Sequence, residues 1–149
     1  MKPIKCFSSQ PKLAIGAGLI EVLIAVLVLA IGLLGVAAMQ AATLRNSESA
    51  LSRSQGVIDT YTIIDAMRAN AGVARSGGYN MGLSGSAPSG SDLAASDRAF
   101  WIATLKTNLG AGAKGLINCA STICTVEVHW NDERAGGAAD QVYKTQVRI

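Results

Sequence analysis

The sequence predicts an α+β protein in which one long N-terminal helix packs on a small antiparallel β-meander with a second, short helix. Three observations predict this fold: a long apolar segment near the N-terminus, a helical apolar stripe that follows it, and short alternating segments near the C-terminus. The 149 residues are enough for one small domain and an appendage. We expect a basic leader over residues 1–16, a transmembrane half-helix over 17–42 and a globular domain over 43–149.

The apolar segment is long enough to span a membrane. Residues 22–39 are 18 consecutive apolar or glycine residues, which make about 27 Å of helix at 1.5 Å per residue. Lys2, Lys5 and Lys12 precede the segment without any acid, so the positive-inside rule places the N-terminus in the cytoplasm. A secretory signal usually has a shorter apolar core, although the alanines that end this segment would also suit a signal-peptidase site.

The basic excess of the chain lies before the apolar segment. The formal net charge is +3, and the three leader lysines account for it, because ten other Lys and Arg residues balance the ten Asp and Glu residues. A nucleic-acid-binding domain would carry its basic groups on a folded face. We therefore expect no specific nucleic-acid binding.

Glu21 is the one charged residue between residues 17 and 42. A carboxylate within a membrane helix costs on the order of 2.5–3.5 kcal/mol on insertion scales. Two interpretations are open: Glu21 lies at the membrane surface, or it acquires a positive partner after processing, for which a newly freed α-amino group would serve.

The helical pattern continues beyond the apolar segment, and we expect one helix from about Ala17 to about Asn70. Its second half is polar apart from an apolar stripe that a small domain would cover. The residues of this predicted stripe are Leu44, Leu51, Val57, Ile58, Tyr61, Ile64 and Met67.

Residues 72–91 are rich in Gly and Ser, which predicts a surface loop. A second helix is predicted over residues 92–109, with Ser91 or Asp92 as its cap. The expected buried face of this helix consists of Leu93, Phe100, Trp101 and Leu105.

Three strands complete the predicted meander, over residues 115–119, 123–130 and 141–149. The second strand alternates between two kinds of position, as expected for a half-buried strand. The third strand is expected to place Tyr143, Val147 and Ile149 on one face.

Cys119 and Cys124 lie close together in the domain that the leader sends across the membrane, which indicates a disulfide, with two reduced thiols as the alternative. His129 is the only histidine, so we expect no metal site. We expect His129 and the adjacent acids Asp132 and Glu133 to be solvated. We find no Ser/His/Asp set, phosphate loop or paired carboxylates at catalytic spacing, so we expect neither an enzyme nor a cofactor.

Residues 16–23, Gly-Ala-Gly-Leu-Ile-Glu-Val-Leu, resemble the leader junction of type IV pilin-like proteins, in which a glutamate follows the cleavage site by five residues. The resemblance implies that a prepilin peptidase cleaves between Gly16 and Ala17 and methylates the Ala17 amine. It also implies that Glu21 pairs with the N-terminal amine of a neighbouring subunit during assembly. Ala17 and Gly18 stand where the family usually has Phe and Thr.

Other stretches resemble the PilV group of minor pilins, also called type IV pilus modification proteins. They are residues 29–35, residues 64–70, Tyr79-Asn80, the helix that carries Trp101, and residues 126–132.

The PilV resemblance implies a structural subunit that helps to initiate pilus assembly in a tip complex, and that supports adhesion, twitching motility and DNA uptake. Implied partners are other minor pilins, the major pilin, the prepilin peptidase and the pilus assembly platform. The protein would reside in the inner membrane before assembly and on the cell surface afterwards. Two alternatives stay open: a pseudopilin of a type II secretion system, and a periplasmic binding domain on a membrane anchor.

Overall fold

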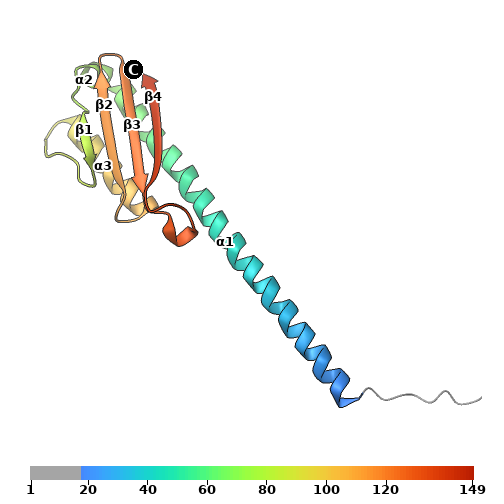
Figure 1. Cartoon of the computed structure of the whole chain (residues 1–149). Helices are drawn as coiled ribbons and strands as arrows, with labels where there is room; N and C mark the ends of the chain where they lie inside the picture. The colour runs from blue at the N-terminus through green and yellow to red at the C-terminus, as the bar shows by residue number, and fades with distance from the viewer. Residues whose placement is uncertain (1–17) are drawn as a thin grey trace, which may run out of the picture. The chain divides into compact units, whose positions relative to one another are not determined.

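The computed structural model describes residues 18–149, so the predicted cleavage site at Gly16 and Ala17 lies outside the described residues. The chain divides into two compact units, Met1–Gln40 and Ala41–Ile149. Figure 1 shows the elements in chain order. They are α1 (Leu19–Ala69), α2 (Ala71–Arg75), β1 (Met81–Ser84), α3 (Leu93–Leu109), β2 (Lys114–Ala120), β3 (Ile123–Trp130), a short 3₁₀ helix (Glu133–Ala135) and β4 (Gln141–Arg148).

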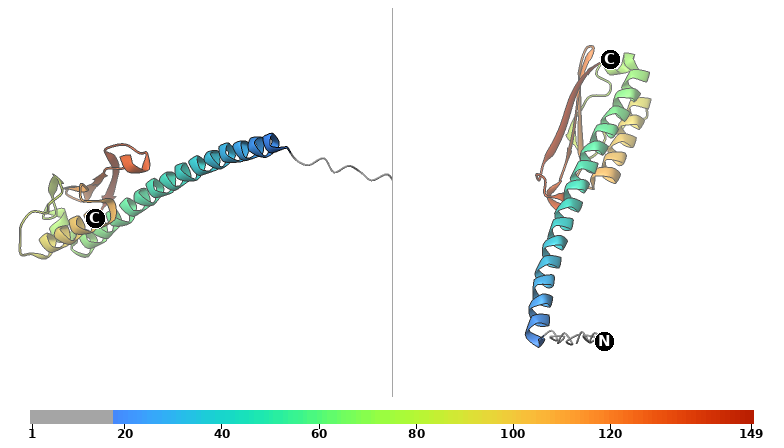
Figure 2. Two further views of the ribbon diagram at one scale, coloured as in Figure 1. Left: turned by 90° about the horizontal axis from the view of Figure 1, so that it is seen from below. Right: turned by 90° about the vertical axis from the view of Figure 1, so that its right-hand side faces the viewer.

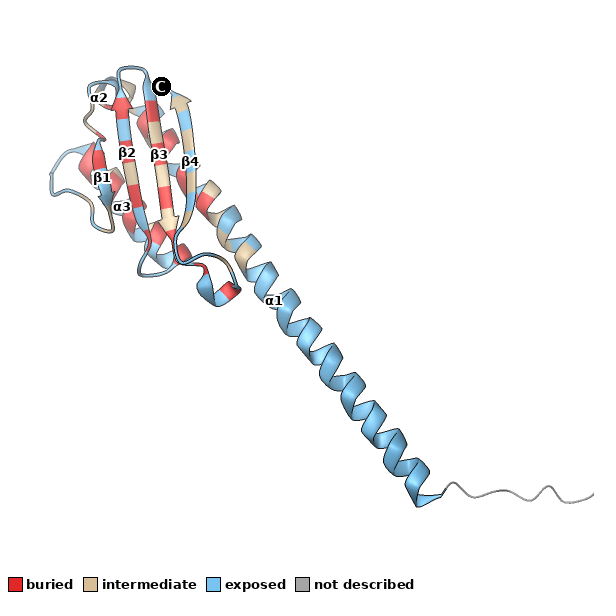
Figure 3. Ribbon diagram, viewed as in Figure 1, coloured by how far each residue is buried: buried red, intermediate tan, exposed pale blue. Residues whose placement is uncertain are grey.

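The predicted α+β fold is confirmed: a long N-terminal apolar helix is followed by a small antiparallel sheet and a short second helix. The predicted long helix corresponds to α1, and the three predicted strands correspond to β2, β3 and β4. In the first unit, every described residue up to Gln40 is exposed, as the uniform colour of this part of α1 in Figure 3 shows.

The sheet has the strand order β1-β2-β3-β4, and every neighbouring pair is antiparallel. β2 pairs with β3 from Lys114↔His129 to Ala120↔Ile123 without interruption. β1 is short, and its register against β2 shifts between Met81 and Ser84. The sheet is therefore a meander with β1 and β4 as its two edges.

Two helices cover one face of this sheet, as the right-hand view of Figure 2 shows for α3 and the second half of α1. Glycines let both helices approach the sheet. A Cβ atom on Gly115 of β2 would lie 2.5 Å from the Trp101 ring of α3. A Cβ atom on Gly56 of α1 would lie 3.3 Å from the Trp130 ring of β3. The main core lies between these layers, where Trp101 and Ile64 are fully buried.

The core face of α1 differs from the predicted stripe. Leu44, Leu51 and Ile58 are exposed by 71%, 67% and 57%, and Tyr61 is also exposed. Only Ile64 and Met67 of the predicted stripe are buried. The residues that α1 does bury are Gly56, Asp59, Thr60, Ile63, Ile64 and Met67.

Polar contacts with α3 explain why the buried face of α1 includes Asp59. The indole Nε1 of Trp101 donates to the main-chain oxygen of Asp59 at 2.9 Å. The side-chain amide of Asn108 donates to both carboxylate oxygens of Asp59 at 3.1 Å. Because these bonds satisfy Asp59, α1 buries this acid next to α3, while Leu44, Leu51 and Ile58 of the predicted stripe stay exposed.

The second predicted helix is confirmed as α3, and the Asp92 carboxylate caps it by accepting from the Ala95 N–H at 3.1 Å. Trp101 and Leu105 are buried as predicted. The prediction was wrong for Leu93 and Phe100, which are exposed. The helix instead buries small and long side chains on the neighbouring positions, namely Ala94, Ala95, Arg98, Ile102 and Leu109.

The predicted loop over residues 72–91 is only partly a loop, because it contains α2 and β1. Side chains fix this segment. The Asn80 carboxamide bonds to the main chain of Cys119 on β2 twice, accepting from its N–H at 2.7 Å and donating to its C=O at 3.3 Å. Tyr79 is fully buried, and its hydroxyl donates to Asp97 of α3 at 2.6 Å.

Candidate functional site

Glu21 lies in the first turn of α1 and is exposed, as are its apolar neighbours. The main-chain oxygen of Gly18 accepts from the Glu21 N–H at 2.9 Å and from the Val22 N–H at 3.3 Å, so Glu21 lies where the helix begins. Within residues 18–42, Glu21 is the single charged side chain. A carboxylate in this position has a cost in any apolar surroundings unless a cation compensates it.

The helix that carries Glu21 is long and apolar enough to cross a membrane. Residues 22–39 supply the apolar stretch, and all of them are exposed. An apolar helix without cover in its own chain requires lipid or other protein around it. The chain thus has one candidate membrane anchor in the part that the structure describes.

The predicted disulfide is present between Cys119 and Cys124. The two residues face each other near the end of the β2–β3 hairpin, and Cys124 is fully buried. The Asn80 carboxamide bonds to the main-chain N–H and C=O groups of Cys119. The disulfide therefore closes the hairpin where the α2–β1 segment is attached to the sheet.

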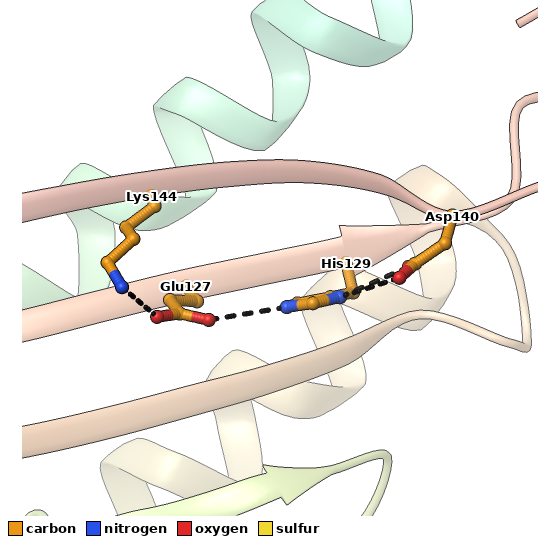
Figure 4. Close-up of polar contacts among 4 residues, drawn as sticks. All are labelled: Glu127, His129, Asp140 and Lys144. Carbon is orange, nitrogen blue, oxygen red and sulfur yellow. Dashed lines mark hydrogen bonds and ion pairs between the residues drawn. The ribbon is translucent and has the colours of Figure 1, made fainter. Parts of the chain in front are cut away.

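A charged network that was not predicted crosses β3 and β4 on the face of the sheet away from the core. Figure 4 shows its four members in one row. Lys144 Nζ lies 2.8 Å from Glu127 Oε1, and Glu127 Oε2 lies 3.4 Å from His129 Nε2. His129 Nδ1 lies 3.1 Å from Asp140 Oδ1. Basic and acidic side chains thus alternate along the row.

The expectation that His129 is simply solvated was wrong. Its side chain is only 14% exposed, because the neighbouring acids flank both ring nitrogens. The hydrogen bond from Lys144 lowers the pKa of Glu127 below its usual value, and partial burial opposes this shift. The network joins the start of β4 to β3, which is a structural role. Its only sequence signal was the alternation of Glu127 and His129. Their partners, Lys144 on β4 and Asp140 just before it, meet them only through the strand register.

The hollow beside this network is open to solvent and has a mixed lining. Lys114 and Asp140 carry opposite charges on its wall, so the hollow presents no single charge that would select a ligand. Its lining residues are Leu83, Gly112, Lys114, His129, Trp130, Asn131, Ala139 and Asp140.

Among residues 18–149, no group of three or more His, Cys, Asp and Glu residues could hold a metal ion.

Asp132 was also expected to be solvated and is instead 4% exposed. The Ser49 hydroxyl of α1 donates to its carboxylate. Asp132 also organises the turn that follows β3, because its main-chain oxygen accepts from the N–H groups of Ala135 and Gly137. The adjacent Glu133 is exposed, as predicted. Asp132 therefore attaches the β3–β4 connection to α1.

Comparison with known proteins gave no match to a family model, to a curated protein or to a solved structure.

Proposed function

We propose that this chain is a minor type IV pilin, a structural subunit that helps to prime pilus assembly in a tip complex. The observation that carries the proposal is Glu21, a single acid in the first turn of an exposed apolar helix. A cation from outside this helix has to compensate such a group. The N-terminal amine of a neighbouring subunit has the required charge once residues 1–16 are removed.

The exposed apolar surface of α1 also supports this proposal. Residues 22–39 require lipid around them before assembly and other helices around them afterwards. The inner membrane and the helices of other minor pilins and of the major pilin would provide these surroundings in turn. A prepilin peptidase and the pilus assembly platform are the further partners, and the assembled subunit would support adhesion and twitching motility at the cell surface.

Mass spectrometry of the N-terminus tests the proposal. We expect the mature chain to start at Ala17 with one methyl group on its amine, both in membranes and in sheared filaments. Recovery from sheared pili distinguishes a pilin from a secretion-system pseudopilin. A chain that starts at Met1 or near Thr43 would contradict prepilin processing and favour an ordinary anchor or signal peptide.

Substitution of Glu21 tests the charge pairing. Glu21→Gln keeps the shape and removes the charge, so membrane insertion should be unchanged or improved. The amount of subunit in sheared filaments should fall by about tenfold, which corresponds to about 1.4 kcal/mol. Glu48→Gln is the matched control, because Glu48 is an exposed acid further along the same helix. Equal incorporation of Glu21→Gln and wild type would rule out the pairing.

A further inference from the structure

β4 is an edge strand whose outer main-chain groups have no partner strand. It is last in the strand order, and among residues 18–149 only β3 pairs with it. Its register against β3 is regular over all eight pairs from Ile123↔Arg148 to Trp130↔Gln141. The other edge strand, β1, is half as long and irregular, and both features protect a sheet edge from further pairing. β4 has neither a bulge nor a proline.

The geometry of the sheet shows which β4 groups point outward. The Cα atoms of Cys119 and Cys124 are 4.0 Å apart, the short spacing of a pair that is not hydrogen-bonded. The main-chain groups of Cys124 therefore point toward β4 and bond to its partner Val147. In agreement, the next pair of the same parity is bonded, since the Ile149 N–H donates to the Thr122 oxygen at 2.9 Å.

Because this pattern alternates, the even-numbered residues of β4 direct their N–H and C=O groups away from the sheet. These residues are Val142, Lys144, Gln146 and Arg148. The four N–H and four C=O groups form a regular row at the free edge. A row of this kind is a template for an added strand.

The side chains on the two faces of β4 indicate the chemistry of that strand. On the solvent face, Lys144 and Arg148 are exposed cations; Lys144 already pairs with Glu127, and Arg148 has no acidic partner among the described residues. On the helix face, Tyr143 and Val147 are half-buried and pack against the core. Because β4 contains no acidic residue, a second copy of this strand would add a further Lys144 and Arg148 to the same face and no acid to Arg148, which disfavours self-pairing.

We propose that the free edge of β4 binds an extended strand of another protein, with acidic side chains on the solvent face and apolar side chains on the helix face. Main-chain hydrogen bonds to the four outward residues hold the strand in place. One acid pairs with Arg148 and another lies beside Lys144, which also keeps its contact with Glu127. The apolar side chains extend the cover over Tyr143 and Val147. This interaction does not depend on the proposed role in a pilus.

The probe is a capped, fluorescein-labelled peptide of about nine residues in which valine and glutamate alternate. It is titrated against the full chain in detergent micelles. We expect saturable binding, and slower hydrogen exchange of the outward amides of Lys144 and Gln146. The inward amides of Tyr143 and Thr145 already bond to β3 and should change little. This measurement uses the unmodified chain.

Gln146→Pro removes one outward N–H group while leaving the β3 ladder in place. Gln146→Ala is its control, because both variants lose the side-chain hydrogen bond to Thr125. We expect Gln146→Pro to weaken peptide binding by about tenfold and Gln146→Ala by less than about twofold. A peptide with lysine in place of glutamate should bind about tenfold more weakly.

Several outcomes would overturn the proposal. They are no saturable binding, protection of amides elsewhere than the β4 edge, equal binding of the lysine peptide, or equal binding by Gln146→Pro and wild type. A dimer of the full chain that Gln146→Pro dissociates would identify a second copy as the occupant instead.

Discussion

Single polar side chains hold the globular unit together where its elements meet. The Asn80 carboxamide offers a donor and an acceptor in the arrangement of a peptide group, and both bond to Cys119. The Asn80 main-chain oxygen accepts from Arg98 Nη1 of α3 at 3.2 Å. One residue thus joins the segment before β1 to a strand and a helix.

Tyr79 makes the stability of the protein sensitive to alkaline pH. Burial is the main cause that raises the pKa of Tyr79 above its ordinary value of 10.0, and the hydrogen bond to Asp97 raises it further. A raised pKa means that the folded state favours the neutral phenol. The contribution of neutral Tyr79 to the stability of the folded state is therefore complete below pH 10, and it is lost as the pH rises through the folded-state pKa.

We expect Tyr79→Phe to lower the free energy of unfolding by about 1–3 kcal/mol at pH 8, because Asp97 loses its hydroxyl partner. The variant should also lose stability less steeply than wild type above pH 10. Urea unfolding at pH 8 and pH 10.5 measures both effects. Tyr143→Phe, at a half-buried position, is the control. The same slope for Tyr79→Phe and wild type would show that Tyr79 does not cause the alkaline loss.

At the scale of elements, helices and strands with a strong local pattern were predictable. The apolar run gave α1, the Asp92 cap gave the start of α3, and alternation gave β3 and β4. β1 was not predictable, because its four residues include a glycine and depend on pairing with β2. The burial of Asp59 on α1, with Leu51 and Ile58 left exposed, could not be predicted either, since Asp59 becomes buried only where α3 supplies Asn108.

The candidate sites divide in the same way. The disulfide followed from two nearby cysteines, and Glu21 stood out from the sequence because its surroundings are apolar. The network of Glu127, His129, Asp140 and Lys144 needs the β3–β4 register before its members meet. The free edge of β4 needs the strand order as well. Sites whose residues lie close together in the sequence were thus visible, and sites that depend on strand register or strand order were not.

At the scale of the whole molecule, the buried and the exposed apolar side chains of α1 have different roles. Ile63 is 1% exposed and belongs to the core of the globular unit. Leu44, Leu51 and Ile58 recur every seven residues on the same helix and are all more than half exposed. Such a row contributes little to the stability of an isolated chain, and it suits contact with another helix in an assembly.

Two alanine substitutions separate these roles. Leu51→Ala should change the free energy of unfolding by less than about 0.5 kcal/mol, because the side chain is exposed. Ile63→Ala should cost about 2–5 kcal/mol, because it leaves a cavity in the core. If the chain is a pilin, Leu51→Ala should nevertheless reduce incorporation into sheared filaments by several-fold. Urea unfolding and quantitative immunoblots of sheared fractions measure the two effects. Normal incorporation of Leu51→Ala would show that Leu51 takes no part in contacts between subunits.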